Sequence, residues 1–133
     1  MRKAPLGGFI LGWMVVSVLA GFSVGFCSSD PPSQVPSIPV KGMVTMVDLG
    51  SKDCVPCKMM APIMVELEKE YGDRAAIIFV DVWKQREQGS QFDVRVIPTQ
   101  IFFDRDGNEV YRHEGFMDKD SIVKMLRSLG VQG

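Results

Sequence analysis

A chain of 133 residues, of which 46% are hydrophobic, is long enough to bury one core of modest size without structural crosslinks. Its 15 basic and 16 acidic residues nearly balance, which provides no basic surface of the kind that binds nucleic acid. The composition therefore predicts a single folded domain and no nucleic-acid partner.

The pattern of the first 27 residues predicts a targeting segment that does not belong to the folded domain. Arg2 and Lys3 provide a positive head, and residues 6–27 carry no charge. One interpretation is a cleaved signal peptide with its apolar core at Phe9–Ala20 and a cut before Gly21. The other is a retained anchor, since the whole run is about as long as a membrane span. Both predict export, to the bacterial periplasm or the outer face of the inner membrane.

Cys27 lies at the end of this apolar run, where a bacterial lipoprotein carries its lipid-bearing cysteine. That pattern requires a small residue just before the cysteine, whereas this chain has Phe26 there. An incidental thiol at the membrane edge is therefore the preferred interpretation, and lipidation of Cys27 stays open as the alternative.

Residues 28–42 read as a spacer between that segment and the domain. Four prolines interrupt this stretch among several serines: Pro31, Pro32, Pro36 and Pro39. Proline fixes the backbone and lacks a hydrogen-bond donor, so we expect an extended stretch and no packed element. The spacer would hold a domain at residues 43–133 away from the membrane surface.

The domain reads as strands alternating with helices. Short apolar or β-branched runs predict strands, and an apolar residue every three to four positions predicts a helix. The expected strands are Met43–Leu49, Ala75–Val82, Thr99–Phe103 and Glu109–Arg112. The expected helices are Val55–Tyr71, Lys84–Phe92 and a last one capped by Asp118 and ended by Gly130. The order β-α-β-α-β-β-α predicts an α/β fold with a mixed central sheet and flanking helices.

Two cysteines, Cys54 and Cys57, are separated by two residues where the helical pattern of residues 55–71 begins. Thiols held this close can form a disulfide ring and reopen it, which predicts dithiol–disulfide exchange. At a helix N-terminus, unpaired backbone N–H groups and the helix dipole favour a thiolate, so Cys54 is the expected nucleophile. Cys57, one turn further in, is expected to resolve the mixed disulfide. Ordinary core cysteines, or half of a zinc site whose other ligands this sequence lacks, are the alternatives.

The segment Cys54–Ile63 resembles the active-site helix of the thioredoxin family. Val47-Asp48-Leu49 precedes it at the family's spacing, and Val96–Thr99 follows it, with Pro98 at the family's cis-proline position. The resemblance covers residues 43–129 and is closest to exported, membrane-tethered reductases. It implies a thioredoxin fold and a redox-active disulfide between Cys54 and Cys57.

The resemblance also implies a role for Asp48, six residues before Cys54. In thioredoxins the matching aspartate lies below the second cysteine and relays its proton. A carboxyl group buried in an apolar strand has a raised pKa, which suits a proton acceptor that works near neutral pH. The alternative interpretation is an aspartate at a strand end that faces solvent.

At Pro98 the resemblance implies a cis peptide bond with Ile97, facing the cysteines. A substrate strand would then pair with the main chain of Ile97. Val55 and Pro56, between the two cysteines, are expected to belong to the same substrate-binding surface. A trans turn proline is the alternative, because cis bonds are rare in general.

This chain departs from the usual thioredoxin motif, Trp-Cys-Gly-Pro-Cys, at several positions. Asp53 replaces the tryptophan and Val55 the glycine, while Gly50 occupies the position of a second tryptophan. The lysine that usually neighbours the buried aspartate is absent, with Ile77 or Phe79 in that region. A negative charge beside the first cysteine is expected to weaken oxidising power. These departures bear on partner specificity and reduction potential, not on the reaction class.

Together these features predict an enzyme, an exported thiol–disulfide oxidoreductase that reduces protein disulfides without a cofactor or a metal ion. Its expected partners are disulfide-bearing extracytoplasmic proteins, with cytochrome c maturation as a candidate pathway, and a membrane electron donor that restores the dithiol. We expect a monomer that contacts the membrane only through an uncleaved N-terminal segment. A thiol oxidase or isomerase of the same fold is the nearest alternative.

A binding function is the alternative from another class. Thiolate and thioether sulfur bind Cu(I), so a metallochaperone module would combine the cysteine pair with a methionine. Five methionines are candidates: Met43, Met46, Met59, Met60 and Met64. Their places on apolar faces favour core packing instead. The single histidine, His113, is expected at the surface, and Trp83 is expected to pack at a strand end or edge the site.

Overall fold

The computed structural model describes residues 37–133. In this part of the chain seven elements follow one another in the predicted order. They are β1 (Val44–Gly50), α1 (Val55–Tyr71), β2 (Ala75–Asp81), α2 (Arg86–Gln91), β3 (Thr99–Phe103), β4 (Glu109–Glu114) and α3 (Lys119–Ser128). The targeting segment predicted for residues 1–27, and most of the predicted spacer, lie outside the described residues.

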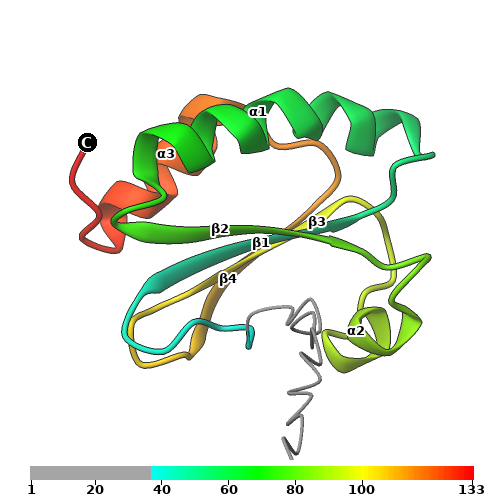
Figure 1. The fold of residues 1–133 in the computed structure, drawn as a ribbon, viewed down its shortest axis with the longest axis horizontal. Helices are drawn as coiled ribbons and strands as arrows, with labels where there is room; N and C mark the ends of the chain where they lie inside the picture. The colour runs from blue at the N-terminus through cyan, green and yellow to red at the C-terminus, as the bar shows by residue number, and fades with distance from the viewer. Residues whose placement is uncertain (1–36) are drawn as a thin grey trace, which may run out of the picture. The chain divides into compact units, whose positions relative to one another are not determined.

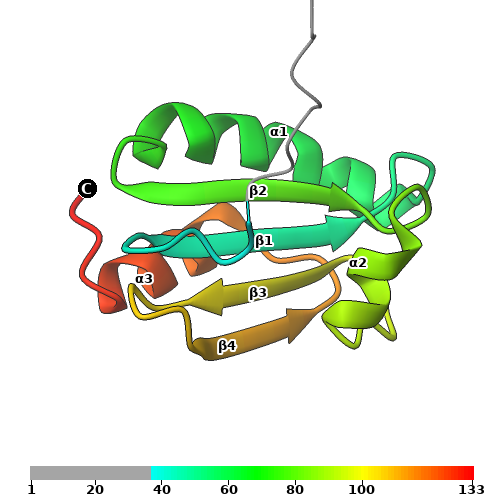
Figure 2. The same cartoon turned by 60° about the horizontal axis from the view of Figure 1, so that its bottom comes forward.

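The four strands form one mixed sheet in the order β2-β1-β3-β4. β1 pairs with β2 in parallel, whereas β3 runs antiparallel to both β1 and β4. The parallel pair requires a crossover, which α1 provides, and the β3–β4 hairpin adds the antiparallel edge. Figures 1 and 2 show α1 and α3 together on one side of the sheet and α2 at its other side. The predicted α/β fold with a mixed central sheet and flanking helices is confirmed.

β1 is buried along its whole length because it is central and covered on both faces. Successive side chains of a strand point to opposite faces, so β1 contributes to two cores. The first core lies between the sheet and helices α1 and α3, and includes Val44, Met46, Met60, Leu67 and Ile122. The second core lies on the other face, and includes Val47, Leu49, Val82, Phe92 and Phe103. The alternation of β1 therefore decides which of its residues face α1.

Several element boundaries differ by one or two residues from the sequence prediction, among them the end of the first strand and both ends of the second helix. β1 extends one residue beyond the predicted end at Leu49, because Gly50 pairs with Asp81 of β2. The second helix is shorter than the predicted Lys84–Phe92. The backbone N–H groups of Lys84 and Gln85 both donate to the carbonyl of Asp81, so these residues belong to the turn after β2.

The last helix begins and ends as its sequence predicts. The side chain of Asp118 accepts a hydrogen bond from the backbone N–H of Ser121 at 2.9 Å, which caps α3. Gly130 follows the helix with a φ of +83°, a conformation that glycine adopts without a steric penalty. Both ends of α3 are thus fixed by single residues.

The end of the predicted spacer contacts the domain. Ile38 packs against the second core, and the backbone N–H of Val40 donates to Thr45 Oγ1 at 3.0 Å. Packing of the domain therefore starts a few residues before position 43, at Ile38. Among residues 37–133, no helix is both long enough and apolar enough to cross a membrane.

Candidate active site

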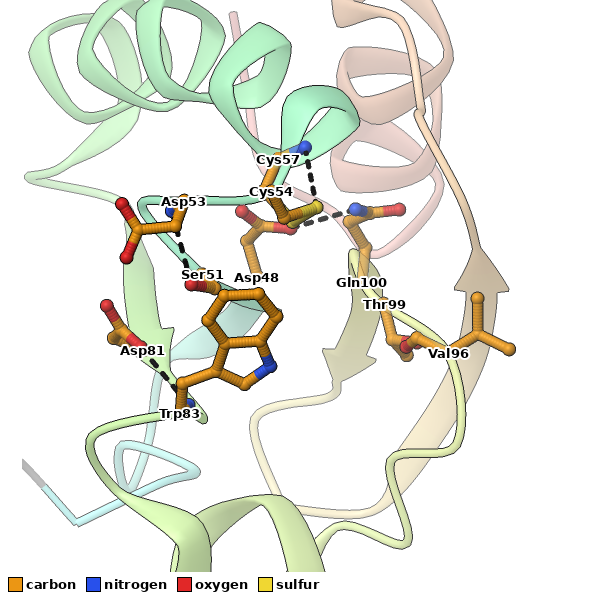
Figure 3. Close-up of a disulfide and its surroundings, with 10 residues drawn as sticks. All are labelled: Asp48, Ser51, Asp53, Cys54, Cys57, Asp81, Trp83, Val96, Thr99 and Gln100. Atoms are coloured by element: carbon orange, nitrogen blue, oxygen red, sulfur yellow. Dashed lines mark hydrogen bonds between the residues drawn. A yellow bond between two sulfur atoms is a disulfide. The ribbon is translucent and has the colours of Figure 1, made fainter.

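Cys54 and Cys57 meet at the N-terminus of α1 and form a disulfide, with their Cα atoms 5.2 Å apart (Figure 3). Cys54 is the N-cap residue of the helix, and its Sγ accepts a hydrogen bond from the backbone N–H of Cys57 at 3.3 Å. The chain reaches this turn directly from β1, which ends at Gly50. The pair therefore stands at one end of the sheet, above its central strand.

The two sulfur-bearing residues differ in their access to solvent. Cys57 is only 4% exposed because it lies on the buried face of α1, whereas Cys54 is partly exposed in the turn before the helix. In the reduced state, the unpaired N–H groups of the first turn and the helix dipole stabilise a thiolate at Cys54. The arrangement thus presents an accessible outer sulfur and a protected inner one.

Asp48 lies in β1 with no exposed surface, so the solvent-facing alternative is wrong. A Cβ atom on Gly50, the next residue on the same strand face, would lie 3.2 Å from Cys57 Sγ. That face of β1 is therefore directed at the inner cysteine, and Figure 3 shows the Asp48 carboxyl group pointing toward the cysteine pair. Burial raises the pKa of Asp48 from 3.8 to about 6, although a hydrogen bond from Gln100 lowers it. This carboxyl group can gain or lose a proton near neutral pH.

Gln100 of β3 is a site residue that the sequence analysis missed. Its Nε2 donates to Asp48 Oδ1 at 2.8 Å, and the two residues are direct cross-strand neighbours. Gln100 is fully buried, within a strand that otherwise reads as an apolar run. A signal was available, because a glutamine inside a buried strand needs a hydrogen-bond partner and Asp48 was the expected buried carboxyl group.

The loop before β3 reaches the same end of the sheet. Thr99, the first residue of β3, pairs with Leu49, so Pro98 adjoins the end of β1 from which the cysteine turn starts. The Ile97–Pro98 bond is cis, as the resemblance implied. The carbonyl of Pro98 accepts a hydrogen bond from the N–H of Gly115 at 2.7 Å. Within residues 37–133, the backbone N–H and carbonyl of Ile97 have no hydrogen-bond partner.

Exposed apolar side chains surround the disulfide. Val55 and Pro56 form the exposed first turn of α1, and Val55 is 72% exposed. Trp83 and Val96, both in the surroundings of the disulfide in Figure 3, are 54% and 46% exposed. The expectation that Trp83 edges the site agrees with this position. A partner that approaches Cys54 therefore meets several exposed apolar side chains together with the exposed Asp53.

An apolar cavity of about 370 Å³ lies beside the inner cysteine, between α1 and β2. Its lining includes Cys57, Met64, Ile77 and Phe79. Gly50 adjoins it, because a Cβ atom there would lie 3.2 Å from Cys57 Sγ and 3.4 Å from Phe79 Cε2. A side chain at position 50 would therefore press on the inner cysteine and occupy this space.

The methionines considered as Cu(I) ligands serve mainly in the core. Met46, Met60 and Met64 belong to the first core and are at most 7% exposed, whereas Met59 is exposed. Packing accounts for the three buried ones, as their places on apolar faces indicated. In the described part of the chain, no three histidine, cysteine, aspartate or glutamate residues are grouped so that they could hold a metal ion.

A mixed sheet, a cysteine pair at the N-terminus of its first helix and a buried carboxyl group beneath that pair define the class of dithiol–disulfide oxidoreductases. The family model for thioredoxin matches residues 38–128, which is most of the chain. This chain belongs to the thioredoxin family, which confirms the family that its sequence motifs predicted. It is accordingly a thioredoxin-like disulfide oxidoreductase.

Bacterial thioredoxins are similar to this chain over the folded domain. The thioredoxin of Staphylococcus haemolyticus (strain JCSC1435) is 36% identical over 87 residues, which make up 65% of this chain and 83% of that protein. The thioredoxin of Staphylococcus saprophyticus subsp. saprophyticus is 34% identical over 87 residues, again 65% of this chain and 83% of the relative. The similarity thus spans most of each relative.

Two solved structures show the same fold. Deadhead, a germline-specific thioredoxin from Drosophila melanogaster, has a TM-score of 0.59 and 26% sequence identity, covering 66% of this chain and 82% of Deadhead. Chloroplastic thioredoxin z has a TM-score of 0.61 and 19% identity, covering 68% of this chain and 81% of that one. At the lower identity the likeness concerns the fold alone, and it agrees with the predicted thioredoxin fold.

Proposed function

We propose that this protein is an extracytoplasmic reductase of protein disulfides, in which Cys54 attacks and Cys57 resolves. The observation that carries this assignment is the unequal burial of the two sulfurs at the N-terminus of α1. An attacking thiolate must be reached by its partner, whereas a resolving thiol must stay protected and close to the first sulfur. Cys54 meets the first requirement and Cys57 the second.

The first step converts the reduced enzyme into a mixed disulfide. The Cys54 thiolate attacks one sulfur of the partner's disulfide, so that a Cys54–partner bond forms and the partner's own S–S bond breaks. The second sulfur of the partner leaves as a thiolate and takes a proton from water. The N–H of Cys57 and the helix dipole stabilise the attacking thiolate before this step.

The second step requires a base for the Cys57 thiol. Asp48, a carboxyl group with a pKa of about 6 on the strand face that is directed at Cys57, accepts this proton. The Cys57 sulfur attacks Cys54 Sγ, which forms the Cys54–Cys57 disulfide and releases the partner as a second thiolate. Two electrons have then passed from the enzyme dithiol to the partner. A dithiol donor in the membrane returns two electrons and two protons to the enzyme.

The partner binds as an extended segment beside Cys54. The N–H and carbonyl of Ile97 have no partner within residues 37–133, so they are available to pair with the main chain of such a segment. Pro98 adjoins this position, and Val55 and Pro56 add exposed surface next to the outer sulfur. Main-chain pairing would give affinity for many disulfide-bearing proteins, with selectivity from the apolar surroundings.

Reduction is supported over oxidation by the residues around the pair. Strong oxidants stabilise their reduced form, in which the outer cysteine is a thiolate. Asp53 is exposed immediately before Cys54, and its negative charge disfavours that thiolate. Pro56 and Ile97 also resemble reducing members of the family. Export is supported by the uncharged run at residues 6–27, and the clients we propose are extracytoplasmic proteins such as cytochrome c precursors.

Insulin reduction tests the activity. Purified protein with dithiothreitol as the electron donor is expected to precipitate insulin chains faster than dithiothreitol alone, because Cys54 attacks disulfides faster than a small thiol does. Cys54→Ser removes the nucleophile and should return the rate to that of dithiothreitol alone, whereas Cys27→Ser should keep the wild-type rate. Wild-type activity in Cys54→Ser would contradict the proposal.

Trapping identifies the clients. Cys57→Ser permits the first step and blocks the second, so mixed disulfides with partners should accumulate. A reductant should cleave these mixed disulfides and release the partners. The full chain carrying Cys57→Ser, expressed in cells and purified without a reductant, is expected to bring extracytoplasmic proteins with it. Cys54→Ser/Cys57→Ser is the matched control. Adducts made only with cytoplasmic proteins would contradict the proposed location.

A further inference from the structure

A row of four side chains crosses the sheet beneath the cysteine pair. Phe79, Asp48, Gln100 and His113 are successive cross-strand neighbours on β2, β1, β3 and β4. Directly paired residues project from the same face of a sheet, which here is the face covered by α1. Asp48 and Gln100, in the middle of the row, have no exposed surface. The immediate neighbours of the buried carboxyl group are thus a phenyl ring and a neutral amide.

Gln100 holds the Asp48 carboxyl group in one direction. Its Nε2 donates to Asp48 Oδ1 at 2.8 Å, while Asp48 Oδ2 and Gln100 Oε1 have no partner in the described part of the chain. The bond joins residues 52 positions apart, so it depends on the register between β1 and β3. The strand pairing therefore fixes how the carboxyl group is presented to the inner cysteine.

A carboxamide suits a carboxyl group that exchanges a proton. Its NH₂ group donates to the carboxylate. After a flip of the amide group by about 180°, its carbonyl oxygen accepts a hydrogen bond from the protonated acid. Both protonation states of Asp48 can thus be satisfied by Gln100 in a buried site. An apolar side chain would satisfy neither state, and a cation would favour the carboxylate alone.

We propose that Gln100 is a positioning residue of the reaction, which orients the Asp48 carboxyl group toward Cys57 and sets the pH range in which it accepts the Cys57 proton. This inference rests on the proposed function, in which Asp48 is that acceptor. Gln100 acts through Asp48 and is not itself a donor or acceptor of the transferred proton.

Few other groups bear on Asp48. Figure 3 shows the two cysteines beside Asp48, and β4 contributes His113 to the same row, with its Nε2 3.1 Å from the carbonyl oxygen of Phe116. Burial and the bond from Gln100 are the two influences on the Asp48 pKa, and no charged side chain of residues 37–133 contributes to it. Removing the amide therefore removes the one favourable influence on the carboxylate.

The test is Gln100→Met, which keeps an unbranched side chain of similar size and removes the amide. Carboxyl ¹³C NMR follows the titration of Asp48 in the oxidised protein, and insulin reduction is measured across the same pH range. Loss of a hydrogen bond to the carboxylate raises the Asp48 pKa, so both midpoints should move upward by about one pH unit or more. Activity at pH 6 should fall to about one fifth of wild type. His113→Asn, in the same row, should leave both midpoints in place.

An unchanged Asp48 midpoint in Gln100→Met overturns the inference, and so does a shifted midpoint without a matching shift of the activity profile. In an Asp48→Asn background, Gln100→Met should have no further effect on the activity profile. A wild-type profile in Asp48→Asn alone would instead show that Asp48 is not the acceptor, and the proposed second step would fail. Gln100→Asn, one methylene shorter, is the second variant, with the same outcomes, if Gln100→Met does not fold.

Discussion

Ionised Asp48 lowers the stability of the folded state, because its carboxyl group is buried. Burial raises its pKa from 3.8 to about 6, so between these pH values the folded protein holds a proton that the unfolded chain has released. The free energy of unfolding therefore falls as the pH rises through this window. This loss of unfolding free energy is absent well below pH 3.8 and complete well above pH 6. Its full size is about 3 kcal/mol, from two pH units at about 1.4 kcal/mol each.

Asp48→Asn is expected to stabilise the protein at neutral pH. The amide cannot ionise, and its oxygen can still accept the hydrogen bond from Gln100. Urea unfolding of the oxidised protein should show a gain of up to about 3 kcal/mol at pH 7.5 and almost none at pH 4. Asp106→Asn, an exposed change in the turn before β4, should show no such pH dependence. An equal gain at both pH values would contradict a raised pKa for Asp48.

Asp48 could be predicted from the sequence, whereas for Gln100 the sequence indicated only the need for a hydrogen-bond partner, and the identity of that partner depends on long-range pairing. Asp48 lies within an apolar run six residues before a recognisable cysteine motif, so its burial follows from local pattern and its role is what the resemblance to thioredoxins implies. The importance of Gln100 depends on a partner 52 positions away. Register between strands is set by the whole sheet, and a single apolar strand does not reveal which residue it will oppose.

At the scale of elements, α1 joins the site to the core through one buried face. Its buried residues recur at intervals of three and four positions: Cys57, Met60, Met64, Leu67 and Tyr71. The same face that protects the inner sulfur therefore packs on the sheet, so packing of α1 and placement of the cysteine pair are linked.

Leu67→Ala tests that packing. Leu67 has no exposed surface, and loss of its side chain from a packed core should cost about 2–5 kcal/mol in the free energy of unfolding. Val65→Ala, two residues earlier on the solvent side of α1 and 68% exposed, should change it by no more than about 0.5 kcal/mol. Urea unfolding measures both. Equal effects of the two changes would mean that α1 does not pack through this face.

Element boundaries were predictable where local sequence decides them. The ends of α1 coincide with the predicted Val55–Tyr71, because the helical pattern and the cysteine turn are both local. The predicted end of the first strand at Leu49 was one residue short, because Gly50, a residue type depleted in strands, is held in the sheet by pairing with Asp81. Pairing across the sheet also explains why β4 continues to Glu114, opposite Thr99.

At the scale of the whole molecule, the order of strands and helices was sufficient to predict an α/β fold with a mixed sheet, and the resemblance supplied the thioredoxin fold. Two strands joined by a helix pair in parallel, and a short turn between two more gives an antiparallel hairpin. The cavity beside Cys57 was not predictable from the sequence. It depends on how α1 packs against β2 and on the lack of a side chain at Gly50, which adjoins the cavity. Direction of electron flow is likewise a property of the protein together with its partners.

The proposed direction of electron flow, from this protein to its clients, predicts that the cysteine pair is reduced in cells. A reductase is kept as a dithiol by its donor, whereas an oxidase is kept as a disulfide, because each must be ready to act. Cells that express the full chain are quenched in acid, and free thiols are labelled with a maleimide large enough to shift the protein on a gel. The wild-type chain should carry two labels more than Cys54→Ser/Cys57→Ser, which retains Cys27 as the background. Equal labelling of the two would mean that the pair is held oxidised, and the protein would then act as a thiol oxidase.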